Sequence, residues 1–112
     1  MRDAIVIGLA CLAASGSVAQ AARETDYALQ CRGCHGADGA GVPGRVPSLA
    51  GVAGLLDTEA GRTRLLAVPG VRQASLSDAR LAALLEWVAV RFAPPGAAAP
   101  GKLTPGEVAR LR

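Results

Sequence analysis

The clearest pattern of apolar and polar positions lies between residues 76 and 92. Apolar residues recur there every three or four positions, which predicts the buried face of an amphipathic helix: Leu81, Leu84, Leu85, Val88 and Phe92. Ser77 is a favourable N-cap, and Asp78 places negative charge in the first turn. Leu76 and Leu81 flank this start as a hydrophobic staple. Prolines at positions 94 and 95 end the predicted helix.

Weaker patterns predict further helices on either side. Residues 25–35 form one short helix, and a second begins at Asp57 or Thr58 and runs to about Val68. Residues 36–54 are too rich in glycine and proline for a regular element, so we expect a loop. Thr104 and Glu107 form a capping box for a last helix, which is marginal unless it docks. No alternation typical of strands occurs, so the predicted fold is all-α.

The beginning of the chain is typical of a secretory signal peptide. Residues 4–14 are apolar, small residues follow, and Ala19-Gln20-Ala21 is an A-x-A cleavage site. We predict a signal peptide over residues 1–21 and a periplasmic mature protein. An uncleaved membrane anchor is the alternative, because the uncharged stretch is about long enough to cross a bilayer. Lipidation of Cys11 is not expected, because lipoprotein signals have a leucine, two small residues and then the cysteine, and Leu9 lies only two positions before Cys11.

Composition limits what the mature chain can do. Hydrophobic residues make up 51% of the 112 positions but aromatic residues only 3%, so the side-chain core is small and a bulky cofactor or cross-link is expected to support it. The net charge is +3, without the charge runs or interleaved aromatic residues of a nucleic-acid-binding protein. Nucleic acid is therefore not an expected partner.

The motif that carries chemistry is C-x-x-C-H at residues 31–35. On a helix, Cys31 and Cys34 share one face, so both thiols can bond the two vinyl groups of one haem, and His35 can bind the iron. A zinc site would need another ligand pair, and a thioredoxin-type site would need a βαβ unit that the pattern lacks. A disulfide between the two cysteines would close only a very small loop. One covalently bound haem c is therefore the predicted cofactor.

Beyond this motif, residues 27–92 resemble a small bacterial class I cytochrome c. The glycine-rich run after His35, the Pro47-Ser48-Leu49-Ala50-Gly51 segment and the helix from residue 76 onward are similar to that family. The resemblance implies three to four short helices around the haem. It also implies that the Pro47 carbonyl accepts a hydrogen bond from His35, and that Trp87 lies on the helix that crosses the first helix near the haem edge.

The sequence departs from the family at the second axial ligand. The family's methionine corresponds in register to Val71, and the only methionine of the chain is Met1. The iron is then five-coordinate or water-bound, covered by a partner protein, or bound by another group. Gln73 is the nearest candidate ligand, and Lys102 and the new N-terminal amine are the others. Without axial methionine, a lower potential is expected.

These observations predict a cytochrome c domain over residues 22–92, followed by a Pro/Ala/Gly linker and a short helix over residues 93–112. The predicted function is one-electron transfer, as partner or small subunit of a periplasmic dehydrogenase or oxidase, and not catalysis by the chain itself. The alternative is a haem-based ligand-binding protein, sensor or weak peroxidase that uses the open position, with Arg72 or a carboxylate nearby. A structural protein without haem is the third possibility.

Overall fold

The computed structural model describes the backbone of residues 4–112 and the side chains of residues 16–112. Its regular elements in this range are all helical, as predicted. They are α1 (Ala4–Gln30), α2 (Arg32–His35), the 3₁₀ helix η1 (Leu49–Gly51), α3 (Val52–Leu56), α4 (Glu59–Ala67), α5 (Asp78–Arg91) and α6 (Pro105–Leu111). Residues 1–3 of the predicted signal peptide, and the side chain of Cys11, lie outside the described residues.

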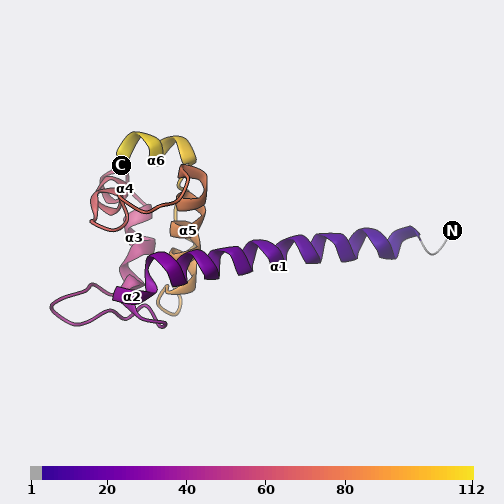
Figure 1. Ribbon diagram of the computed structural model, residues 1–112, viewed down its shortest axis with the longest axis horizontal. Helices are drawn as coiled ribbons and strands as arrows, with labels where there is room; N and C mark the ends of the chain where they lie inside the picture. Colours follow the sequence, from indigo (N-terminus) through magenta and orange to yellow (C-terminus); the bar gives the residue numbers. More distant parts are fainter. Residues whose placement is uncertain (1–3) are drawn as a thin grey trace.

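The first helix is much longer than the pattern predicted. Figure 1 shows α1 running from the body of the molecule, where its last turns pack, out toward the N-terminus. Among the described residues, no helix combines the length and the hydropathy that a membrane span requires. The helix predicted over residues 25–35 is divided at Cys31, whose φ of −126° interrupts the regular geometry before α2. Helical hydrogen bonding continues across this break, because the Cys31 amide donates to the Tyr27 carbonyl and the His35 amide to the Cys31 carbonyl.

The prediction of a loop over residues 36–54 was wrong at its end. Residues 49–51 form η1 and α3 begins at Val52, within the segment expected to be irregular. Val52, Ala53 and Leu56 are buried against the core, so tertiary packing outweighs the poor helix propensity of the glycines at 51 and 54.

The predicted helix starts are confirmed by their caps. Ser77 Oγ accepts from the Arg80 amide at 3.2 Å, and Thr104 Oγ1 from the Glu107 amide at 3.1 Å. Of the two candidate caps for α4, the structure selects Thr58, whose Oγ1 accepts from the Gly61 amide at 3.0 Å. Local side-chain chemistry therefore determines where these three helices begin.

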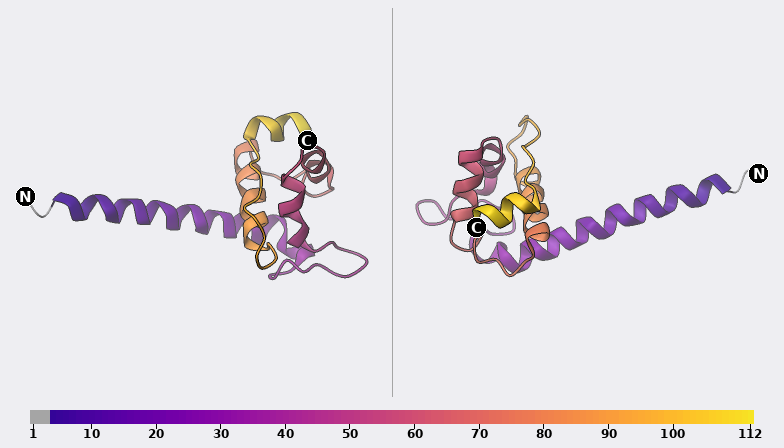
Figure 2. Two further views of the ribbon diagram at one scale, coloured as in Figure 1. Left: turned by 180° about the vertical axis from the view of Figure 1, so that it is seen from behind. Right: turned by 90° about the horizontal axis from the view of Figure 1, so that it is seen from above.

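The last helix packs against the rest of the protein, which a helix this short needs in order to be stable. Figure 2 shows α6 lying across the ends of α4 and α5, and it packs on both. Val108 of α6 and Leu103 just before it are buried, and Arg62 of α4 pairs with Glu107 at 2.6 Å. The backbone amide of Leu103 donates to Glu86 of α5 at 2.7 Å, which fixes the entry of the chain into α6.

The last turns of α1 also pack against α5. Asp26 is 1% exposed and pairs with Arg80 of α5. Next to this ion pair, the chain's three aromatic side chains form one cluster: Tyr27, Trp87 and Phe92. The ring centroid of Tyr27 lies 5.7 Å from that of Trp87 and 5.1 Å from that of Phe92, and aromatic pairs attract each other at these distances. The crossing of α1 and α5 is thus held by both charge and apolar contact.

Candidate functional site

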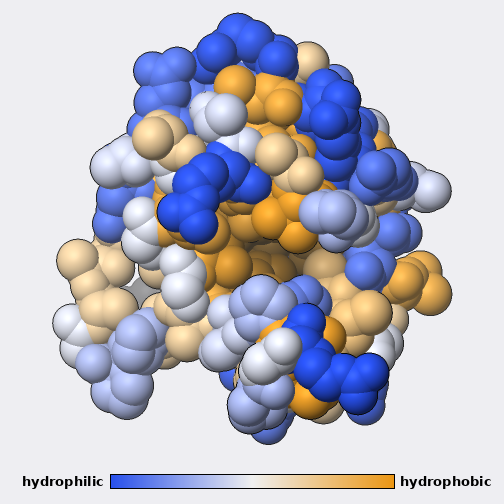
Figure 3. Space-filling model, turned by 90° about the vertical axis from the view of Figure 1, so that its left-hand side faces the viewer, coloured by the Kyte–Doolittle hydropathy of each residue, from blue (hydrophilic) through white to orange (hydrophobic). Residues whose placement is uncertain are grey.

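A largely apolar cavity lies where α2, the loop after α4 and the face of α5 meet. Gln30, Cys31, Cys34 and His35 line one side of it. The loop contributes Val68, Pro69, Gly70, Val71 and Ala74, and α5 contributes Leu81, Leu84 and Leu85. On the side of the molecule away from the start of α1, Figure 3 shows a hollow among apolar side chains. The amphipathic stripe that predicted α5 therefore also supplies part of the cavity wall.

The orientation of His35 is set by the segment that follows it. Its Nδ1 lies 2.9 Å from the carbonyl oxygen of Pro47, the contact that the family resemblance implied. Because a carbonyl oxygen only accepts, Nδ1 carries the proton and donates. In the neutral ring, Nε2 is then the nitrogen whose lone pair can bind a metal.

The loop between His35 and Pro47 turns back tightly enough to make this contact. The Gly41 amide donates to the His35 carbonyl at 2.9 Å, and Val42 and Val46 exchange backbone hydrogen bonds of 2.9 and 2.8 Å. Gly41 has a φ of +67°, and a Cβ there would collide with the carbonyl groups of Val46 and Pro47. Only glycine fits this position. The sequence showed a glycine-rich run here but not which glycine the turn depends on.

The two cysteines are free thiols at the edge of the cavity. Cys31 is partly buried and Cys34 is exposed, and burial raises the pKa of the Cys31 thiol above its ordinary value. In the part of the chain that the structure describes, no three His, Cys, Asp or Glu side chains gather closely enough to hold a metal ion.

The structure places Val71 and Gln73 differently with respect to the cavity. Val71 lines it, as Cys31, Cys34 and His35 do, and packs against the core. Gln73 is exposed and does not line it, since its Oε1 accepts from the Gly70 amide at 3.0 Å and closes the loop on itself. Gln73 as an iron ligand stays a prediction that this conformation does not favour.

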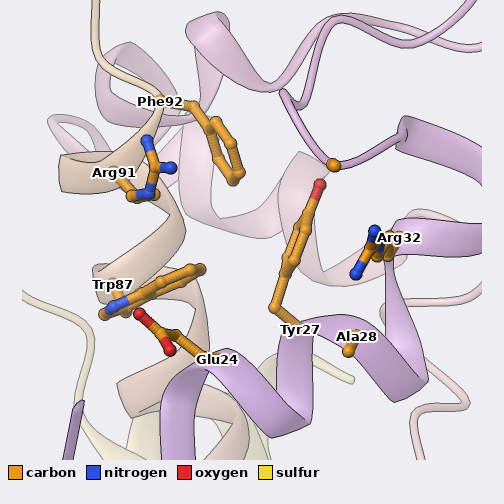
Figure 4. Close-up of a pocket in the computed structure, with 8 residues that line it drawn as sticks. Glu24, Tyr27, Ala28, Arg32, Trp87, Arg91 and Phe92 are labelled. Carbon is orange, nitrogen blue, oxygen red and sulfur yellow. The ribbon is translucent and has the colours of Figure 1, made fainter. Parts of the chain in front are cut away.

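Trp87 is also outside this cavity. It belongs to the aromatic cluster and lines a separate, shallower hollow, where Figure 4 shows the side chains of Arg32 and Arg91 beside the rings. Tyr27 reaches across this region, and its hydroxyl donates to the carbonyl of Gly36, directly after the motif. Trp87 therefore supports the helix crossing next to the site, and the structure does not bring it to Cys31, Cys34 and His35.

The residues that do come together fit a covalently bound haem. Two thiols and an imidazole with a free Nε2 lie along one side of a cavity whose other walls are aliphatic. Thiols supply the attachment points and a neutral imidazole the axial nitrogen, while leucine and valine walls suit the porphyrin's apolar faces. Val71, which has the register of the family's methionine and lines the cavity, has no lone pair and so cannot replace the usual thioether ligand.

Comparison with known proteins agrees with this geometry. The family model described as cytochrome c matches residues 21–111, which include the motif, the Pro47 segment, α5 and the segment predicted as linker and final helix. No curated protein and no solved structure matches the chain. The match spans far more than half of the sequence. The chain therefore belongs to the cytochrome c family, as a class I c-type cytochrome: a haem-based electron carrier whose haem c is bound covalently.

Proposed function

We propose that the chain is an exported cytochrome with one haem c, anchored through Cys31 and Cys34, with His35 as the proximal iron ligand. The observation that carries this proposal is the hydrogen bond of 2.9 Å between His35 Nδ1 and Pro47 O, beside a cavity that both thiols line. When bound, haem c supplies one-electron chemistry at its iron. The protein's own residues attach the haem, orient the imidazole and exclude water.

Each of these tasks has identifiable residues. Pro47 fixes the tautomer of His35 and strengthens its Nε2 as a donor. Leu81, Leu84 and Leu85 keep polar groups out of the cavity wall, and a low-dielectric wall affects the reduction potential. Val71 shields the side opposite the proximal ligand without binding the iron. In this proposal the sixth coordination position is open or holds water, with Gln73, Lys102, the new N-terminal amine or a partner protein as the alternatives, and the potential is lower than that of a relative with axial methionine.

For the biological role, we propose electron exchange with a protein partner, a periplasmic dehydrogenase or oxidase. Support comes from the family match and from the A-x-A pattern at residues 19–21. The chain acts in this proposal as a carrier or small subunit, not as an enzyme. A membrane is a partner only if residues 1–21 are retained as an anchor.

Two measurements on protein made with a haem-maturation system test the core of this proposal. Pyridine haemochrome analysis should give one haem c per chain, and intact mass should match a chain that starts near Ala22 plus one haem. The Cys31→Ala/Cys34→Ala variant should lose covalent haem and cooperative unfolding, since the cofactor supplies much of the buried apolar surface. A well-folded, haem-free double variant would contradict this role for the haem, and a product that retains Met1 would show that the anchor reading is right.

The position of Val71 in the cavity also favours a second candidate function, a haem protein that binds small ligands at an open iron. The rates of carbon monoxide binding to ferrous protein and of cyanide binding to ferric protein separate the two. If both ligands bind slowly, another group closes the sixth position and only the carrier function stands, whereas fast, saturable binding supports the ligand-binding function. Absorption spectra of both oxidation states report coordination in the same samples.

A further inference from the structure

The loop that carries Val71 is built as a fixed unit. Within residues 68–77, the amides of Val71 and Arg72 both donate to the Val68 carbonyl, at 3.1 and 3.0 Å, and the Ala74 amide donates to the Val71 carbonyl at 3.2 Å. The Gly70 amide is satisfied by Gln73. These bonds hold the loop's own shape, but they do not attach it to the rest of the molecule.

Val71, Ala74 and Leu76 pack against the core, and the polar attachment of the loop comes from a residue distant in sequence. The Arg112 guanidinium donates from Nη1 to the Ala74 carbonyl at 3.3 Å and from Nη2 to the Leu76 carbonyl at 2.9 Å. Nε donates to Asp78 Oδ1 at 2.9 Å, and Nη2 lies 2.7 Å from the same oxygen. One planar group thus binds two loop carbonyls and the first residue of α5. A lysine ammonium cannot reproduce this set, because it lacks the rigid fork of donors.

Arg112 is held in place independently of the loop. It directly follows α6, which is secured by the buried Val108 and by the Arg62–Glu107 pair. The Arg112 side chain is itself mostly covered, at 21% exposed. The loop is therefore tied to the α4–α5–α6 core through this side chain.

We propose that Arg112 is a positioning residue that holds Val71 over the cavity and thereby sets how readily ligands reach the iron. This inference rests on the proposed haem site and its open sixth position. Releasing the carbonyls of Ala74 and Leu76 lets the loop move away from His35, so access increases without a change in any residue that lines the cavity.

The test uses haem-loaded Arg112→Lys and Arg112→Ala, with Arg110→Ala as the matched control. Arg110 belongs to the same short helix, but it is 57% exposed and pairs only with Glu59 and Glu107 among the described residues. Cyanide association with the ferric Arg112 variants should be about tenfold faster than with wild type, which corresponds to about 1.4 kcal/mol. The control should leave the rate unchanged. Arg112→Lys keeps the charge and so covers the case in which Arg112→Ala fails to fold.

A second readout does not depend on ligand access in the wild type. In a Val71→Met background, the sulfur-to-iron band in the near infrared reports whether the loop places residue 71 over the iron. Adding Arg112→Lys should weaken that band, whereas adding Arg110→Ala should not. Where the wild type binds cyanide, an unchanged or slower rate in Arg112→Lys overturns the proposal, and where it does not, an unchanged band does.

The possible failures are distinguishable. Wild type that does not bind cyanide contradicts the open position, and the band in the Val71→Met background then decides the role of Arg112 alone. Fast wild-type binding that Arg112→Lys leaves unchanged contradicts only the role of Arg112. Absence of both cyanide binding and the band means that the loop does not cover the iron, and the inference falls with it.

Discussion

Replacing Gly41 by alanine tests how the loop orients the histidine. Alanine at a φ of +67° costs about 1–2 kcal/mol from backbone sterics alone. Its Cβ would also collide with the carbonyls of Val46 and Pro47. These carbonyls accept from the Val42 amide and from His35 Nδ1, two hydrogen bonds worth about 0.5–1.5 kcal/mol each. Gly41→Ala should therefore lower the free energy of unfolding by about 2–5 kcal/mol.

Gly44→Ala in the same loop is the matched control. Gly44 has a φ of +76°, but a Cβ there meets nothing within 4 Å, so only the backbone cost of about 1–2 kcal/mol applies. Denaturant unfolding of both haem-loaded variants gives the difference. The reduction potential supplies a second measurement, which should change in Gly41→Ala and not in Gly44→Ala because only the former disturbs the His35–Pro47 bond. Equal destabilisation and equal potentials in the two variants would refute this reasoning.

Three further predictions concern the axial position and the α1–α5 crossing. Val71→Met should create the near-infrared sulfur band and raise the potential, since it offers a thioether where the family has one, and an unchanged spectrum would mean that the register is wrong. Tyr27→Phe should cost about 1 kcal/mol at neutral pH, because it removes the hydrogen bond to Gly36. Burial raises the pKa of Tyr27, so the stability advantage of the wild type over Tyr27→Phe should be lost as pH rises from about 10 through the folded-state pKa. Denaturant titrations at several pH values measure this loss. Arg80→Ala should destabilise the fold more than Asp26→Asn, although Arg80 is 55% exposed. The reason is that it leaves the Asp26 carboxylate, at 1% exposure, with Arg23 at 3.8 Å as its remaining ion-pair partner among the described residues. Thermal unfolding of both variants checks this order.

Local side-chain chemistry made the helix starts predictable from the sequence, whereas contacts between residues far apart in the chain were not predictable from it. Ser77 and Thr104 act on amides three residues away, within the reach of a sequence pattern. The α3 helix was missed because its stability comes from burial against α5, which outweighs its glycine content. Asp26 and Arg80 are 54 positions apart, and no periodicity pairs them.

The candidate site shows the same division. The spacing of Cys31, Cys34 and His35 predicted a shared haem site from helical geometry, and the contact with Pro47 came from the family resemblance. Trp87 does not line the cavity, whereas the family resemblance implied a place near the haem edge. An amphipathic pattern gives the buried face of α5 but does not show which neighbour covers each part of that face. Arg112 left no signal in the sequence, because its role depends on how α6 folds back on the start of α5.

The gathering of every aromatic residue at one helix crossing has a consequence for optical experiments. Intrinsic fluorescence arises from Trp87 and Tyr27 alone, and both lie where α1 meets α5. A haem quenches nearby indole emission by energy transfer, so emission of the haem-loaded protein reports the separation of the α1–α5 crossing from the haem, whereas far-ultraviolet circular dichroism also reports the region of α3, α4 and α6. A transition followed by fluorescence that coincides with one followed by far-ultraviolet circular dichroism would show that the two regions unfold together. Transitions that separate would identify the α1–α5 crossing as a cooperative unit of its own.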